Sequence, residues 1–319
     1  MKLVLYKEPG DALLPGLLLE RGVVPIGAYL PAGLAGQSAM VWLIDHLDQV
    51  RAALNLAAER DHAMPHEQVR LGPPLPQPRK ILNAIGNYWE HAQRDPKPLN
   101  MFLKNPDAVI GPGDTIHLPA NTAPSSFMHE AELAVVIKGP AKSVARADWR
   151  SAVFGYTCII DVTARGEGRR TWAPGSSMSW IGKSFDTFAP IGPCIVTADE
   201  IENPNDLHVQ FWNDGQLRHN YNTDDMEHTV PEIVEFASGV MTLNSGDILS
   251  CGTNHEGLGF LQDGEQVEIC IHGIGRMSLQ VVDPLKREWE RGVYMGQDST
   301  HHEAVKRYRP NTILKPSSV

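Results

Sequence analysis

Residues 127–139 read FMHEAELAVVIKG, and they place two glutamates at the entrance to an apolar run. The five residues LAVVI, 133–137, predict a buried strand, because a short run of β-branched and other apolar residues suits a strand that is covered on both faces. Successive side chains on a strand point to opposite faces, so Glu130 and Glu132 project to the same side, about 7 Å apart at the backbone. Both carboxylates can therefore reach one point.

A third carboxylate follows another apolar strand, in YTCIIDVTAR at residues 156–165. An acid at this place is costly to bury unless it is paired, hydrogen-bonded or bound to a metal, which makes Asp161 the best candidate to complete the set. Carboxylate oxygens are hard ligands that suit Mg²⁺, Mn²⁺ or Ca²⁺, and three of them leave coordination positions open for substrate and water. The alternative is that Glu130 and Glu132 lie in a loop before the strand and that Asp161 caps a turn.

Composition narrows the class of protein. The 319 residues suffice for one large domain and a small one without disulfides, and the four cysteines show no CxxC spacing, which predicts reduced, buried thiols. No apolar run approaches the roughly 20 residues of a membrane span. The net charge of -10, with no concentrated basic face, argues against nucleic acid. The N-terminus lacks the pattern of a signal peptide, so we expect a cytoplasmic protein.

The chain divides at a proline-rich stretch. Residues 71–80 read LGPPLPQPRK, with four prolines, and predict a linker or a rigid crossing strand. We therefore expect a small N-terminal α+β domain at 1–72, with a helix at 39–60, and a catalytic domain at 73–319. The latter is predicted to be mostly β, a mixed β-sandwich roll, with helices only at 145–153 and 229–241. Strands are predicted at 80–86, 115–119, 132–139, 153–164, 191–198, 207–215, 247–253 and 266–282.

Several motifs occur in a characteristic order: HEAELAVVIKG, GYTCIIDVTAR, IGKSFDTFAPIGPCIVTADEI, LRHNYNTDDM and SGDILSCGTNHEGLG. On these motifs the chain resembles the fumarylacetoacetate hydrolase family over about residues 80–283, which leaves a polar tail at 284–319. The resemblance implies a β-roll catalytic domain, usually a homodimer, with a divalent metal held by Glu130, Glu132 and Asp161. Mg²⁺ is the first expectation, and Mn²⁺ and Ca²⁺ are the alternatives.

The resemblance also implies roles for residues that bind the substrate. Lys183, in GKSFD, matches the family lysine that faces the metal-bound substrate, where an ammonium stabilises an enolate or oxyanion. Thr253, in CGTN, matches the Gly-Thr turn that contacts the substrate carboxylate, although the family usually has TGTP there. Independently of the resemblance, Arg165, Arg169 and Arg170 can bind a carboxylate or a phosphate. The alternatives are a surface lysine, an ordinary turn and a solvated basic loop.

A predicted base lies in GNYWEHAQRD, where His91 matches the histidine that acts with a glutamate to activate water. Arg94 occupies the place of that glutamate, and Glu90, Asp95 or a carboxylate from a distant segment can still orient His91. The alternative is that His91 is an exposed loop histidine.

Other positions depart from the family pattern or carry weak signals. Gly166 and Gly168 stand where Asp and Gln are common, and His219 stands where Gln is common. The segment GLGFLQDG lacks a βαβ context and is not a dinucleotide fingerprint. No metal-binding role is predicted for His301 and His302 in the polar tail.

The leading functional hypothesis is a metal-dependent hydrolase that cleaves a C–C bond in a small 2,4-dioxo acid of the acylpyruvate or fumarylacetoacetate type. The second keeps the metal and Lys183 but omits water attack, which gives a decarboxylase, tautomerase or hydratase acting on a related oxo acid. A third is a family member that binds a metabolite without catalysis.

Overall fold

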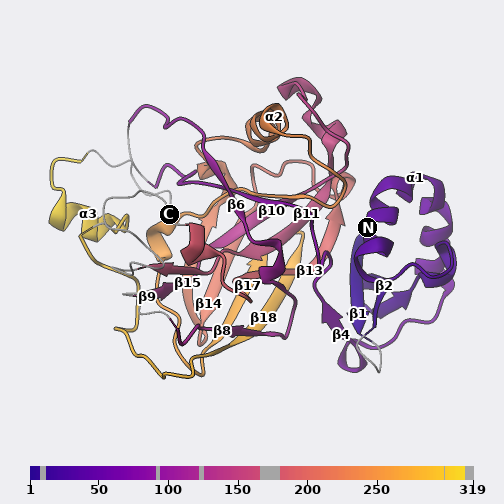
Figure 1. Ribbon diagram of the computed structural model, residues 1–319, viewed down its shortest axis with the longest axis horizontal. Helices are drawn as coiled ribbons and strands as arrows, with labels where there is room; N and C mark the ends of the chain where they lie inside the picture. Colours follow the sequence, from indigo (N-terminus) through magenta and orange to yellow (C-terminus); the bar gives the residue numbers. More distant parts are fainter. Residues whose placement is uncertain (8–11, 91–93, 122–125, 166–179, 298, 313–319) are drawn as a thin grey trace.

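A computed structural model describes residues 1–7, 12–90, 94–121, 126–165, 180–297 and 299–312. The N-terminal residues form an antiparallel sheet covered by one long helix. The elements are β1 (Lys2–Lys7), β2 (Leu13–Leu19), β3 (Gly22–Pro25), α1 (Gly36–Arg60) and β4 (Arg70–Gly72). Helix α1 buries an apolar stripe that includes Met40, Leu43 and Leu47, and Figure 1 shows it beside β1 and β2 at one end of the molecule.

The largest sheet runs through the whole molecule in the order β3-β2-β1-β13-β11-β10-β16-β5-β6, with β4 also paired to β1 and β7 to β13. The N-terminal strands thus extend the sheet of the larger part of the chain, through the pairing of β1 with β13. The further strands of this sheet are β5 (Ile81–Ala84), β6 (Met101–Lys104), β7 (Val109–Ile110), β10 (Ala131–Ile137), β11 (Val153–Ile160), β13 (Ala189–Thr197) and β16 (Ile248–Ser250).

A second sheet has the order β15-β14-β17-β18-β8, and β9 pairs with β12 in a short ribbon. These strands are β8 (Thr115–His117), β9 (Ser126–Met128), β12 (Thr163–Arg165), β14 (His208–Asn213), β15 (Gln216–Asn222), β17 (Gln266–Ile271) and β18 (Gly275–Val282). Contacts of β13 with β18, β10 with β14 and β11 with β17 stack the second sheet on the first. The core between the sheets contains the wholly buried strands β10 and β11.

Helices are few outside the N-terminal part. They are α2 (Val230–Val240) and α3 (His302–Tyr308), with 3-10 turns at Gly27–Tyr29, His66–Gln68, Pro106–Ala108, Arg146–Ala152, Trp180–Lys183, Ala198–Glu200, Thr223–Asp225 and His255–Gly257. Figure 1 shows α3 at the end of the molecule opposite to α1. Within the described ranges, no helix is long and apolar enough to cross a membrane.

The predicted fold class is confirmed as a mixed, sheet-rich architecture. The long helix begins at residue 36, three residues earlier than predicted, and the helix expected at 145–153 is a 3-10 turn. The tail contains α3, which was not predicted. The four cysteines are free, as expected, with Cys270 only partly buried. The division at residue 72 stays a prediction, because the strands on its two sides share one sheet.

Candidate active site

The three predicted carboxylates meet where β10 and β11 run side by side. Ala131 pairs with Ile160, and one residue further along, the Asp161 amide donates to the Glu130 carbonyl at 2.8 Å. Glu130 and Asp161 are therefore cross-strand neighbours, and Glu132 lies two residues along on the same face. One oxygen from each carboxylate lies within 4.8 Å of the others, and all three residues are buried. The strand period thus explains the cluster, although Glu130 itself precedes the first residue of β10.

Glu132 accepts hydrogen bonds from the end of β16 and from the turn that follows it. The Ser250 hydroxyl and the Gly252 amide both donate to Oε2 of Glu132, the latter at 3.0 Å. Burial, with the nearby charges of Asp161 and Glu130, raises the pKa of Glu132 well above its ordinary value. Without a bound cation, burial therefore favours the protonated form of Glu132.

Lys183, for which the family resemblance predicts a substrate-facing role, reaches the same cluster. Its Nζ lies 2.6 Å from Glu130 Oε2, 2.7 Å from Asp161 Oδ2 and 2.7 Å from Thr163 Oγ1. Burial opposes the charge on this ammonium, but the carboxylates of Asp161 and Glu130 outweigh it and raise the pKa of Lys183. Lys183 is consequently a permanent cation at the centre of the site.

Two further cations surround the carboxylates. Lys104, at the end of β6, is fully buried, and its Nζ donates to Asp161 Oδ1 at 2.7 Å and to the Lys183 carbonyl. Arg165 Nη2 lies 3.3 Å from Glu130 Oε1. The sequence reasoning missed Lys104, although alternation along MFLK places its side chain on the same face as the buried Phe102.

A cavity of about 200 Å³ opens beside Arg165, and a histidine–glutamate pair lines it. Nδ1 of His255 is hydrogen-bonded to Glu90 Oε1, which also accepts from the His255 amide at 3.0 Å. Among the described residues Nε2 of His255 has no hydrogen-bond partner. Burial alone would raise the pKa of Glu90, but His255 and then Lys97 lower it, so Glu90 stays ionised.

Glu90 has a backbone φ of 52°, in the left-handed region that residues other than glycine rarely adopt. Such backbone strain clusters at functional sites, where surrounding contacts hold it; here the Asp225 carboxylate accepts from the Glu90 amide at 3.2 Å. The strained backbone and the His255 contact together fix Glu90 at the cavity. The sequence reasoning named Glu90 only as a partner for His91 and missed His255.

The remaining predicted residues divide into two groups. Thr253 is buried in the turn after β16, one residue beyond the Gly252 amide that binds Glu132. His91, Gly166, Gly168 and the arginines at 169 and 170 lie outside the described residues.

The donor set fits a hard divalent cation. Three buried carboxylates converge, one of them with a raised pKa, and oxygen ligands of this kind suit Mg²⁺ or Mn²⁺. The Lys183 ammonium is hydrogen-bonded to two of the same three carboxylates. A cation held by the cluster would therefore share Glu130 and Asp161 with Lys183.

Comparison with known proteins agrees with this geometry. Residues 80–282 match the family model described as fumarylacetoacetate hydrolase, C-terminal. The chain belongs to the fumarylacetoacetate hydrolase family. It is 36% identical to oxaloacetate tautomerase YisK of Bacillus subtilis over 67% of this chain and 73% of that protein. It is 31% identical to a mitochondrial oxaloacetate tautomerase of Bos taurus over 88% of this chain and 92% of that one.

A solved structure of the fumarylacetoacetate hydrolase family is also similar: maleylpyruvate hydrolase from a Sphingobium species, in complex with manganese(II) and pyruvate. Its TM-score is 0.76, its sequence is 34% identical, and the match covers 89% of this chain and 99% of that one. The protein is thus an enzyme of this family, whose members here include hydrolases, tautomerases and isomerases.

Two departures from the fumarylacetoacetate hydrolase pattern have structural explanations. Arg94 donates from Nη1 to Glu227 at 2.8 Å, and Glu227 also accepts from the Lys97 amide, so the pair anchors residues 94–97. His219 is buried, with Nδ1 3.0 Å from the Asn254 carbonyl and Nε2 3.0 Å from His129 Nδ1. Arg94, at the position where the family resemblance predicts a glutamate, therefore anchors this segment through its contact with Glu227.

Proposed function

We propose that the protein is a divalent-metal-dependent hydrolase that cleaves a C–C bond of a 2,4-dioxo acid of the acylpyruvate type. The observation that carries this proposal is the convergence of three carboxylates and Lys183 beside a cavity that holds the His255–Glu90 pair. The relative bound to manganese and pyruvate supports it, because pyruvate is a product of cleaving an acylpyruvate.

Glu130, Glu132 and Asp161 would hold Mg²⁺ or Mn²⁺, which would supply Lewis-acid polarisation of the substrate's carboxylate and 2-oxo group. Thr253, in the buried turn, would donate to that carboxylate. Lys97 lines the cavity with Arg165, so the acyl end of the substrate meets positive charge there. This arrangement favours an acyl group that ends in a second carboxylate.

The chain's own residues can carry the proton transfers. Nε2 of His255 would take a proton from water while the water oxygen bonds to the C4 carbonyl carbon of the substrate. The Glu90 carboxylate stabilises the imidazolium that forms. The C3–C4 bond then breaks, its electron pair enters the enolate of pyruvate, and His255 returns the proton to C3. Lys183 donates a hydrogen bond to the enolate oxygen.

His91 is the competing base, since the family resemblance assigns it this role. Glu90 accepts two hydrogen bonds from His255. Position 94, where the resemblance predicts the carboxylate partner of His91, is an arginine bonded to Glu227. Within the described residues, the histidine with a carboxylate partner at the cavity is therefore His255. We therefore assign the base to His255. In this assignment, His255→Gln lowers kcat for cleavage by about 10²–10⁴-fold, and His91→Gln lowers it by less.

An oxaloacetate tautomerase is the second candidate. The arginine at position 94 favours it, because keto–enol exchange needs the cation, Lys183 and one proton-transferring group but no activated water. The tautomerase relatives in Bacillus subtilis and Bos taurus also support it.

Solvent labelling separates these two candidates. The protein would be incubated in H₂¹⁸O with Mn²⁺ and a panel of acylpyruvates that end in methyl, phenyl or carboxylate groups, and separately with enol-oxaloacetate. Hydrolysis places one solvent oxygen in the newly formed acid and releases pyruvate. Accelerated ketonisation of oxaloacetate, with no cleavage of any acylpyruvate, would establish the tautomerase instead.

We also propose a homodimer, which the family resemblance implies, a cytoplasmic location, which the N-terminal pattern predicts, and a domain boundary near residue 72, which the proline-rich stretch predicts. The first is checked by light scattering, which for a dimer gives twice the chain mass of 35.1 kDa. A monomeric mass at micromolar concentration would contradict it.

A further inference from the structure

A second group of metal-ligating side chains lies apart from the three carboxylates. Glu256 is in the 3-10 turn His255–Gly257, whereas His301 caps α3 and His302 begins it. One ligand atom from each of the three lies within 4.8 Å of the others. The fold thus joins residues that are 45 or more positions apart in the sequence.

Direct contacts already hold this group together. Nδ1 of His302 lies 2.6 Å from Glu256 Oε1, and the rings of His301 and His302 stack with centroids 4.5 Å apart. Two stacked imidazoles beside a carboxylate would repel each other if both were protonated. A cation bound by all three side chains would keep both rings neutral and would also neutralise the carboxylate.

The donor types differ from those of the carboxylate cluster. Two imidazoles and one carboxylate form a typical set for Zn²⁺, which takes nitrogen and oxygen ligands and often leaves one position for water. All-oxygen sites instead prefer Mg²⁺ or Mn²⁺. The two groups should therefore discriminate between these metals.

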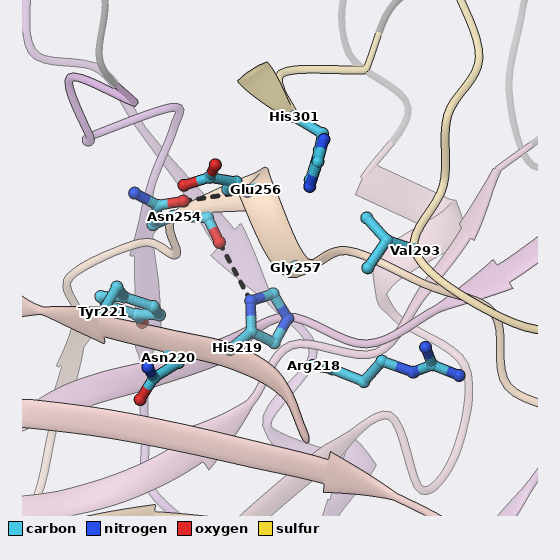
Figure 2. Close-up of a pocket in the computed structure, with 9 residues that line it drawn as sticks. All are labelled: Arg218, His219, Asn220, Tyr221, Asn254, Glu256, Gly257, Val293 and His301. Carbon is cyan, nitrogen blue, oxygen red and sulfur yellow. Dashed lines mark hydrogen bonds between the residues drawn. The ribbon is translucent and has the colours of Figure 1, made fainter. Parts of the chain in front are cut away.

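Space for the open coordination position is present. A cavity of about 210 Å³ adjoins the group and is lined by Glu256, His301 and Gly257. Figure 2 shows the His301 ring extending from the C-terminal segment among the residues that line this cavity. His219 also lines the cavity, but both its ring nitrogens are already hydrogen-bonded.

The geometry requires only a small adjustment. Zinc bonds of about 2.0–2.2 Å in a tetrahedron place two ligand atoms about 3.4 Å apart. The present separations reach 4.8 Å at most, so shifts of about 1 Å in the side chains close the site.

We propose that Glu256, His301 and His302 form a second metal site that takes Zn²⁺ and ties the C-terminal segment to the turn that carries His255. Ser299 and Thr300 line the same cavity as His255. An occupied zinc site therefore fixes one wall of the catalytic cavity. This last consequence rests on the function proposed above, whereas zinc binding does not.

Zinc binding would be measured on the untagged full-length chain in excess Mg²⁺, which occupies the carboxylate cluster, by competition with a chromophoric chelator. The wild type should bind one zinc per chain. The double variant His301→Ala/His302→Ala should bind zinc more than about 100-fold more weakly, because even the loss of a side chain that only hydrogen-bonds to a metal ligand lowers metal affinity by about 10–100-fold. His62→Ala/His66→Ala, which removes two exposed histidines of the N-terminal part, is the matched control and should retain the zinc.

Glu256→Gln keeps the shape of the site and loses one ligand, so it serves as the second variant if the double variant is unstable. Co²⁺ in place of Zn²⁺ reports the ligands through its visible absorption, which should be intense in the wild type and lost in Glu256→Gln. Equal zinc affinity in wild type and both variants, or no zinc bound by the wild type, would overturn the proposal. Neither readout depends on the reaction, so a failed functional proposal leaves the test intact.

Discussion

The Lys183→Met variant separates the two roles of the central lysine. In the metal-free protein, Lys183 is the ammonium bonded to both Glu130 and Asp161, at 2.6 and 2.7 Å. Removing one partner of a buried ion pair costs about 3–5 kcal/mol, because the remaining charges lose their compensation. With an unfolding entropy of about 2.1 cal/mol/K per residue, the 319 residues give about 0.7 kcal/mol per kelvin. Tm in EDTA should fall by about 4–8 °C.

Mn²⁺ should reverse much of this loss. The cation and the ammonium would share the Glu130 and Asp161 carboxylates, so the variant should bind Mn²⁺ more tightly than the wild type does. Since stabilisation by a ligand grows with its affinity, Mn²⁺ should raise the Tm of the variant by more than that of the wild type. Turnover in saturating Mn²⁺ should still be about 10²–10³-fold lower, as for loss of one oxyanion donor.

Differential scanning calorimetry with and without Mn²⁺ provides the measurement, and Lys138→Met is the matched control. Lys138 forms an exposed pair with Asp48 at 3.2 Å, so its loss should cost less than about 1 kcal/mol. If Lys183→Met and Lys138→Met melted together in EDTA, or if Mn²⁺ raised wild type and Lys183→Met equally, the assignment of Lys183 to the carboxylate site would be refuted.

Two further predictions concern histidines. Glu90→Gln should lower kcat about as much as His255→Gln while Mn²⁺ affinity stays unchanged; a normal kcat in either variant, measured with the acylpyruvate that the wild type cleaves, would contradict the proposed pair. The second prediction concerns His219, whose pKa burial lowers from 6.5 to about 4. As pH falls, the unfolded chain therefore binds a proton at this histidine before the folded chain does. The stability due to neutral His219 is consequently lost between about pH 6.5 and pH 4. That loss amounts to about 3 kcal/mol. In urea unfolding, the free energy of unfolding of His219→Gln should therefore fall by correspondingly less over this pH range than that of the wild type, whereas His62→Gln should behave like the wild type. Parallel pH profiles for the wild type and both variants would argue against this assignment.

The carboxylate cluster could be predicted only partly from local information. Glu130 and Glu132 share a face by strand period, whereas Asp161 was a candidate from its own strand and was joined to them by the family resemblance. The pairing of β1 with β13 could not be predicted in the same way, because register between distant strands depends on packing that no short pattern records.

His255 was missed for a related reason. The altered turn CGTN directly precedes His255, but nothing local shows that Glu90, 165 residues earlier, folds against this histidine. The contact between Glu256 and His302 is likewise a product of the tertiary fold. Lys104 is different, because the alternation in MFLK did contain the signal that its side chain turns inward.

The central claim is that Glu130, Glu132 and Asp161 hold a divalent cation that binds the substrate. Its most direct test is anomalous diffraction at the manganese edge from crystals grown with Mn²⁺ and pyruvate. A single strong peak within about 2.0–2.3 Å of one oxygen from each carboxylate, with pyruvate beside it, is the predicted result. Ordered carboxylates that still bind Lys183, with no peak between them, would contradict the claim.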